Sequence, residues 1–160
     1  MAAWKLLKFL HLALLGGLLA ATAVFYLVPS GVRHDAAPAD TMLYVGAGLA
    51  LTGVLAGQLL LPRVVRGRLS GNTKLSDDPS AWVGAYQTGK LLQWSLIEGP
   101  ALFLGITHWQ TGNQVAIVGA VAWWAYLAYV RPGASELARL IEKDPSRVES
   151  ALRAEDSRAG

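Results

Sequence analysis

The chain has 160 residues, of which 53% are hydrophobic and only 16% are charged, whereas about 25% of the residues of soluble globular proteins are charged. The charges are unevenly distributed, because residues 9–28, 42–61 and 99–130 contain no Asp, Glu, Lys or Arg. This pattern excludes an ordinary soluble domain and predicts an integral membrane protein. The absence of cysteine excludes thiol catalysis, iron–sulfur ligation and disulfide bonds.

The uncharged runs predict an all-α fold, an integral membrane four-helix bundle. A helix rises about 1.5 Å per residue and the hydrocarbon core of a bilayer is about 30 Å thick, so a crossing helix needs about 20 apolar residues. We expect a membrane domain over residues 1–132 and a cytoplasmic tail over 133–160. The four expected spans are residues 9–28, 42–61, 88–107 and 114–130. The apolar parts of the last two are short, so local thinning of the bilayer is expected there.

The first run has two interpretations. Lys5 and Lys8 precede it, and Ala21-Thr22-Ala23 fits the small-x-small rule for cleavage of a secretory signal peptide. The uncharged run of 20 residues is longer than the apolar region of a signal peptide, which has about 7 to 15 residues. A retained membrane anchor is therefore favoured, with cleavage as the alternative.

The basic residues predict the orientation, because cytoplasmic loops near the spans carry the excess of Lys and Arg. Of the 14 basic residues, only Arg33 lies in an expected external connection. Both termini and the loop between the second and third spans are therefore expected in the cytoplasm, with the chain in the inner (plasma) membrane. We interpret these residues as topology signals, so the bilayer is the expected partner and nucleic acid is not.

The tail shows the spacing of a short amphipathic helix. Leu137, Leu140 and Ile141 recur at helical intervals, and Asp144-Pro145 interrupts the pattern. Six acidic and six basic residues balance between positions 131 and 160, which argues against a polybasic lipid sensor. The apolar stripe is therefore expected to pack on the bundle or on a partner protein.

Glu98 is the only carboxylate within an expected span. A charged residue at the centre of a membrane helix costs about 2.5 to 3.5 kcal/mol, so such residues face the protein interior and are candidate functional sites. Pro100 lacks an amide proton, which leaves the carbonyl of Leu96 without its helical donor. The expected polar neighbours of this possible proton or cation site are Thr52, Ser95 and Gln93.

Small residues at a similar depth predict close helix packing. The residues expected to pack helices are Gly16, Gly17, Gly53, Gly57, Gly99 and Pro100. The spacing of Gly53 and Gly57 is the small-xxx-small pattern of membrane helix contacts.

Three interpretations of Glu98 remain open: a structural hydrogen bond between helices, proton or cation handling, and a contact surface for a partner helix.

Sequence motifs of enzymes are missing. The chain has no phosphate-binding loop, no serine hydrolase elbow and no zinc protease motif. We therefore expect no enzymatic activity, no cofactor and no metal. A weak alternative is a metal site on the external face, where His34, Asp35, Asp40 and His108 could meet.

Two stretches carry a resemblance to known families. Gly46, Gly48, Gly53 and Gly57, followed by Glu98-Gly99-Pro100 in the next span, resemble the hairpin of the proteolipid c subunit of rotary ATPases. This resemblance implies that Glu98 binds an ion. As a whole the chain is similar to a group of small uncharacterised bacterial four-helix inner-membrane proteins, through Tyr86-Gln87-Thr88, Glu98-Gly99-Pro100, Thr111-Gly112-Asn113 and Arg131-Pro132.

The functional prediction is a small multi-pass membrane protein of structural or accessory type with one intramembrane carboxylate. The alternative is a proton- or cation-binding membrane protein with a hairpin like that of the c subunit. A membrane-protein partner or a second copy of the chain is the expected protein contact.

Overall fold

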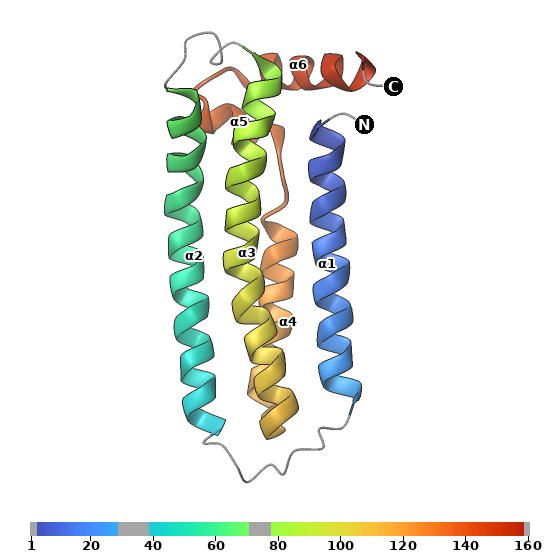
Figure 1. Ribbon diagram of the computed structural model, residues 1–160, viewed down its shortest axis with the longest axis vertical. Coiled ribbons are helices and arrows are strands. Elements are labelled where there is room, and N and C mark those ends of the chain that lie inside the picture. Colours follow the sequence, from blue (N-terminus) through green and yellow to red (C-terminus); the bar gives the residue numbers. More distant parts are fainter. Residues whose placement is uncertain (1–2, 29–38, 71–77, 159–160) are drawn as a thin grey trace. The chain divides into compact units, whose positions relative to one another are not determined.

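The computed structural model describes residues 3–28, 39–70 and 78–158, and these residues form six helices and no strand (Figure 1). In chain order the helices are α1 (Ala3–Leu27), α2 (Ala39–Leu69), α3 (Pro79–Thr111), α4 (Gln114–Tyr129), α5 (Ala134–Leu140) and α6 (Pro145–Arg158). The prediction of an all-α fold is therefore confirmed for the described part of the chain.

The helices α1 and α2 are each long and apolar enough to cross a membrane. They contain 25 and 31 residues, which correspond to about 38 and 47 Å at about 1.5 Å per residue. The predicted runs 9–28 and 42–61 coincide with them, apart from Val28, which follows α1. The helix α2 does not end at Pro62 but continues to Leu69, and the basic residues of its last turn favour this extension because they complement the helix dipole.

The other two predicted spans are less apolar or shorter. The helix α3 has 33 residues and includes the predicted span 88–107, but it buries polar side chains such as Lys90 and Gln93. The helix α4 has 16 residues and meets α5 at an angle of 75°. Among the described residues, a third crossing is therefore compatible with length and composition only if α4 and α5 are taken together as one bent span.

Aspartate residues cap two of the helices. The carboxylate of Asp78 accepts a hydrogen bond from the amide of Ser80 (2.9 Å) at the start of α3, which begins at Pro79, before the predicted span 88–107. The carboxylate of Asp144 accepts one from the amide of Ser146 (2.8 Å) at the start of α6. The hydroxyl and the amide of Ser146 both lower the pKa of Asp144.

The tail contains two helices where the sequence predicted one short amphipathic helix. In α5, Leu137 and Leu140 are buried, and in α6, Val148 and Leu152 are buried. Residues 141–144 separate the two helices, and Glu142 adopts the left-handed backbone conformation (φ 57°) that ends α5. The amphipathic prediction is confirmed, and the break falls at Asp144-Pro145 as expected.

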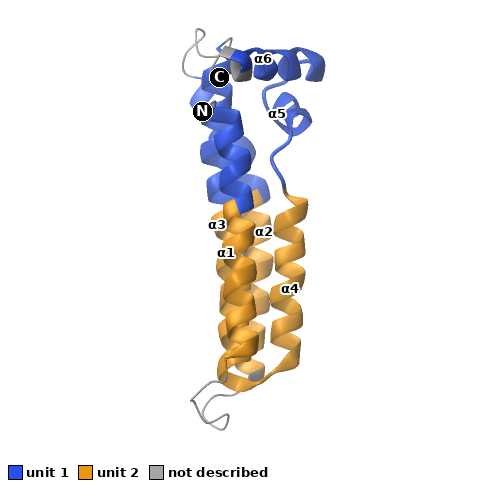
Figure 2. Ribbon diagram, turned by 90° about the vertical axis from the view of Figure 1, so that its right-hand side faces the viewer, with its two compact units in different colours: residues 1–12, 58–93, 131–160 blue, residues 13–57, 94–130 orange. Residues whose placement is uncertain are grey.

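The chain divides into two compact units, which Figure 2 shows in two colours. Unit 1 comprises residues 1–12, 58–93 and 131–160, and unit 2 comprises residues 13–57 and 94–130. Unit 1 therefore contains α5 and α6 together with the first turns of α1, the last turns of α2 and the first half of α3.

Unit 2 contains parts of four helices, and its contacts join all four. Its core is formed by Leu104, Ile117 and Ala120, with Leu43 and Trp123 packed against them. Indole groups add hydrogen bonds to backbone carbonyls at Trp94–Val130 (3.1 Å), Trp109–Val28 (3.0 Å) and Trp124–Leu15 (3.1 Å). Each of these bonds gives an indole N–H a backbone acceptor, and the one at Trp94 is buried.

Candidate functional site

A buried lysine forms the centre of a polar cluster in unit 1. The side chain of Lys90 in α3 is fully buried, and its ammonium lies 2.7 Å from a carboxylate oxygen of Glu136 in α5. It also donates a hydrogen bond to the side-chain carbonyl of Gln93 (3.0 Å), one turn further along α3. A buried charge is costly unless it is paired and hydrogen-bonded. Both conditions are met here, because the lysine has an anion and a neutral acceptor.

Tyr86 completes this arrangement, which we call the Lys90 cluster (Tyr86, Lys90, Gln93 and Glu136). Its hydroxyl donates to the same Glu136 oxygen (2.5 Å) and accepts a hydrogen bond from the amide of Gly133 (3.2 Å). The ring stacks on Trp4 of α1 at 6.1 Å between centroids. The cluster therefore joins α1, α3 and α5 within unit 1.

The electrostatics of the cluster keep its tyrosine protonated. Burial, followed by the negative charge of Glu136 and the hydrogen bond to it, raises the pKa of the Tyr86 phenol. The Lys90 ammonium also lies 5.6 Å from the centroid of the Tyr86 ring, a distance at which a cation is attracted by the ring face. The protonated Tyr86 hydroxyl thus donates a hydrogen bond to the Glu136 carboxylate and holds that carboxylate beside the Lys90 ammonium.

Sequence reasoning did not identify this cluster. In the sequence Lys90 lies at the cytoplasmic end of the expected span 88–107, and Glu136 contributes only to the charge balance of the tail. One signal was available, because Tyr86, Lys90 and Gln93 are spaced at i, i+4 and i+7 and so share one face of a helix. No local pattern indicates that their anion lies on another helix, 46 residues after Lys90.

Glu98, the residue singled out by the sequence, lies in unit 2 and is half-buried. Among the residues that the structure describes, none forms a hydrogen bond or an ion pair with its carboxyl group. The hydroxyl of Thr52 instead donates to carbonyls of its own helix, at Gly48 (2.9 Å) and Leu49 (3.1 Å). The predicted polar environment is therefore not assembled around Glu98 by direct hydrogen bonds.

The other two expected neighbours of Glu98 are also placed differently. Gln93 is buried in unit 1, where it accepts the hydrogen bond from Lys90. Ser95 is exposed and lies, with Thr52, along an open groove of about 560 Å³ between α2 and α3 in unit 2. The residues that line this groove are Leu49, Thr52, Gly53, Ala56, Ser95, Leu96, Gly99, Pro100 and Phe103.

Gly53 of α2 lies close to the backbone of α3. A methyl group on Gly53 would overlap the carbonyl oxygen of Leu96 and lie 3.6 Å from the ring of Pro100. The Cα–H of Gly53 therefore points at that oxygen, the acceptor that Pro100 leaves without an amide donor. In the structure Gly53 faces this carbonyl oxygen, whereas the sequence suggested a protonated Glu98 as its hydrogen-bond donor.

The remaining glycines differ in their surroundings. A methyl group on Gly16, Gly17 or Gly99 would meet nothing within 4 Å in the described residues, so these three do not allow close helix contact within the chain. Gly57 is buried. Three close contacts were not predicted: a methyl group on Gly46 would lie 2.6 Å from Leu104, one on Gly89 would lie 2.7 Å from Leu61, and one on Gly105 would lie 2.7 Å from Phe25.

The external metal site finds no support in the described residues, which contain no group of three His, Cys, Asp or Glu side chains able to hold a metal. His34 and Asp35 lie outside the described residues. His108 is buried and its Nδ1 lies 3.0 Å from the carbonyl oxygen of Asn113, which ties the end of α3 to the start of α4.

Comparisons with protein-family models, curated proteins and solved structures returned no match.

Proposed function

We propose that this protein is a multi-pass membrane protein of structural or accessory type, in which the Lys90 cluster fixes α5 to α3. The observation that carries the proposal is the mutual pairing of the buried polar groups. Lys90, Glu136, Tyr86 and Gln93 satisfy one another through contacts of 2.5 to 3.0 Å. Groups engaged in this way hold helices together, and the cytoplasmic segment α5–α6 is then presented to a partner in one conformation.

The proposed topology has four crossings, with α1, α2, the 88–107 part of α3, and α4. Both termini lie in the cytoplasm of a bacterial cell, with the chain in the inner membrane. The distribution of the basic residues supports this orientation. Of the 14, 12 lie on the cytoplasmic side of the spans 9–28, 42–61, 88–107 and 114–130, Lys90 lies at the cytoplasmic end of the third span, and only Arg33 lies in an external connection. Its 16 residues make α4 about 24 Å long at about 1.5 Å per residue, so the bilayer is expected to thin around it.

The topology is tested by single cysteines, because the natural chain contains none. Ser30→Cys lies in a proposed external connection and Ser150→Cys lies in α6, on the proposed cytoplasmic side. In intact spheroplasts, a membrane-impermeant maleimide should label Ser30→Cys, and it should label Ser150→Cys only after permeabilisation. Equal labelling of both variants in intact spheroplasts would contradict the proposal.

The alternative function is proton or cation binding at Glu98. The observation that favours it is a half-buried carboxyl group with no partner among the described residues, in a helix proposed to cross the membrane. Gly53, one of the glycines that carry the resemblance to a c-subunit hairpin, also faces α3 at the Leu96 carbonyl, two residues before Glu98.

Glu98→Gln separates the two functions, because glutamine keeps the volume and the hydrogen bonding but cannot ionise. For the accessory function we expect proton flux in proteoliposomes to be the same for the variant and the natural chain. We also expect the stability to change by less than about 1 kcal/mol, since hydrogen bonds in membrane bundles average about 0.6 kcal/mol. A flux that is present in the natural chain and lost in Glu98→Gln would establish the alternative.

A further inference from the structure

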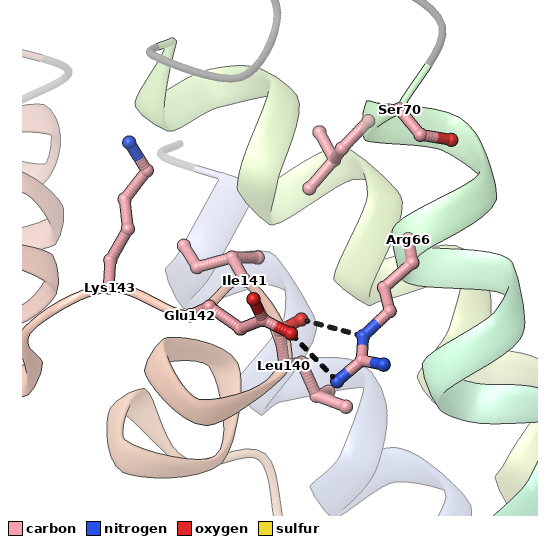
Figure 3. A pocket seen from close by; sticks show the side chains of 7 residues that line it. Arg66, Ser70, Leu140, Ile141, Glu142 and Lys143 are labelled. Atoms are coloured by element: carbon pink, nitrogen blue, oxygen red, sulfur yellow. Dashed lines mark hydrogen bonds and ion pairs between the residues drawn. The ribbon is translucent and has the colours of Figure 1, made fainter.

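A cavity of about 530 Å³ lies in unit 1 between the end of α2 and the turn that joins α5 to α6. Figure 3 shows Arg66 and Lys143 on opposite sides of it, with Ile141 and Glu142 between them. Apolar side chains, among them Leu69 and Leu140, complete the wall. The cavity therefore combines two cations with an apolar surface, which suits an amphiphilic anion.

Arg66 is held across the cavity by two contacts. Its Nε donates to the carbonyl oxygen of Leu140 (3.4 Å), and its Nη2 lies 3.2 Å from a carboxylate oxygen of Glu142 (Figure 3). These contacts use two of the five N–H groups of a guanidinium. The ion pair is largely exposed, at 59% for Arg66 and 76% for Glu142, and exposed pairs contribute little to stability. A stronger anion can therefore replace Glu142 at little cost.

Lys143 is fixed at the other side of the cavity by an aromatic ring. Its ammonium lies 4.9 Å from the centroid of the Trp82 ring in α3, a distance typical of a cation–π contact. The hydroxyl of Ser70, the residue after α2, also lines the cavity. Together these groups provide a planar guanidinium, a point charge and a hydroxyl, which are the groups that bind phosphate oxygens. The Ser70 hydroxyl donates to the carbonyl oxygen of Gly67 at 3.5 Å, and it would turn to a phosphate oxygen on binding.

We propose that this cavity binds a phosphate group, with Arg66 as its main ligand and Glu142 as the internal anion that the phosphate displaces. The source of the phosphate is either an anionic phospholipid or a soluble phosphate ester. The lipid source rests on the proposed function, in which α2 crosses the membrane and Arg66, three residues before its end, lies at the level of the cytoplasmic headgroups. The soluble source does not depend on it.

The test uses the full chain, purified in a neutral maltoside detergent, and measures bound ligand by native mass spectrometry. One arm titrates phosphatidylglycerol against phosphatidylcholine, and the other titrates glycerol 3-phosphate and inorganic phosphate. Arg66→Gln should weaken binding of the phosphate ligand about fivefold or more, since it removes one cation and its paired donors. Glu142→Gln should strengthen binding about two- to fivefold, because it removes the competing charge without changing the side-chain volume.

The matched controls are Arg153→Gln and Glu149→Gln, which alter an exposed Arg–Glu pair on α6 (2.6 Å) that does not line the cavity. Both should leave binding unchanged. Selective retention of phosphatidylglycerol that follows this pattern supports the lipid source, and binding of the soluble phosphates with the same pattern supports the soluble source. Binding that is unaffected by both Arg66→Gln and Glu142→Gln would overturn the proposal, whichever lipid is retained.

The gain expected for Glu142→Gln keeps the test decisive if Arg66→Gln fails to fold. A loss of folding cannot produce tighter binding, so an unchanged affinity in Glu142→Gln with a folded protein would also overturn the proposal. The labelling of Ser30→Cys and Ser150→Cys reports separately on the membrane topology. A wrong topology with intact binding of soluble phosphate would remove the lipid source alone.

Discussion

Replacing Gly53 with alanine is expected to destabilise the protein by about 1 to 3 kcal/mol, the usual cost of forcing an extra carbon into a packed core. The added methyl group would overlap the carbonyl oxygen of Leu96. A backbone oxygen cannot rotate away as the tip of a flexible side chain can, so α2 and α3 must separate. Thermal unfolding of the purified protein in detergent micelles measures the loss.

The controls for this substitution are Gly16→Ala and Gly99→Ala, at positions where a methyl group meets nothing within 4 Å in the described residues. Alanine is favoured over glycine in a helix by about 0.5 to 1 kcal/mol, so both controls should be neutral or slightly more stable. Opposite signs for Gly53 and the two controls would locate the close contact between helices. Equal effects at all three positions would show that Gly53 has no special contact.

The sequence predicted the helices better than their polar contacts. Helices follow from local patterns: long uncharged runs for α1 and α2, and Asp-Pro pairs at the starts of α3 and α6. Each of these signals lies within a few residues of the element that it specifies. The extension of α2 beyond Pro62 was not predicted, because a proline usually ends a helix. Here the helix continues because residues after the proline make other contacts, such as that of Arg66 with Leu140.

The candidate site could not be predicted because its partners are distant in sequence. Lys90 at the cytoplasmic end of a predicted span has the pattern of a boundary residue, and nothing near it in the chain supplies an anion. Glu136 enters only when α5 folds against α3. For Glu98 the sequence predicted three polar neighbours, but two of them have other hydrogen-bond partners: the hydroxyl of Thr52 donates to a carbonyl of its own helix, and Gln93 accepts from Lys90.

Breaking the buried ion pair should have the largest effect of any single substitution in unit 1. Lys90→Met keeps much of the side-chain volume but leaves the carboxylate of Glu136 without its cation. Removing one partner of a buried pair typically costs about 3 to 5 kcal/mol. Glu136→Gln should be at least as costly, because it leaves the fully buried ammonium without an anion, whereas the Glu136 side chain is 25% exposed.

The effect should be concentrated in the segment that the pair holds in place. Hydrogen exchange of the amides in α5 and α6 should accelerate in Lys90→Met. In this variant α5 loses its ion pair with α3, and the Glu136 carboxylate keeps, among the described residues, only the hydrogen bond from Tyr86. Exchange within unit 2 should change less. The exposed pair Arg153–Glu149 provides the comparison, because breaking it should cost no more than about 0.5 kcal/mol.

The double variant Lys90→Met, Glu136→Leu distinguishes a structural role for the pair from a chemical one. A buried ion pair replaced by apolar residues of similar volume is often neutral or even stabilising by about 1 to 4 kcal/mol, so we expect the double variant to recover most of the stability lost by either single variant. A double-mutant cycle should give a coupling free energy of about 2 to 3 kcal/mol. If the function is accessory, it should recover with the stability, because a well-packed α5 would again present the same surface. A double variant that is stable but inactive would instead show that the charges of Lys90 and Glu136 are themselves required, and that the cluster does more than hold helices together.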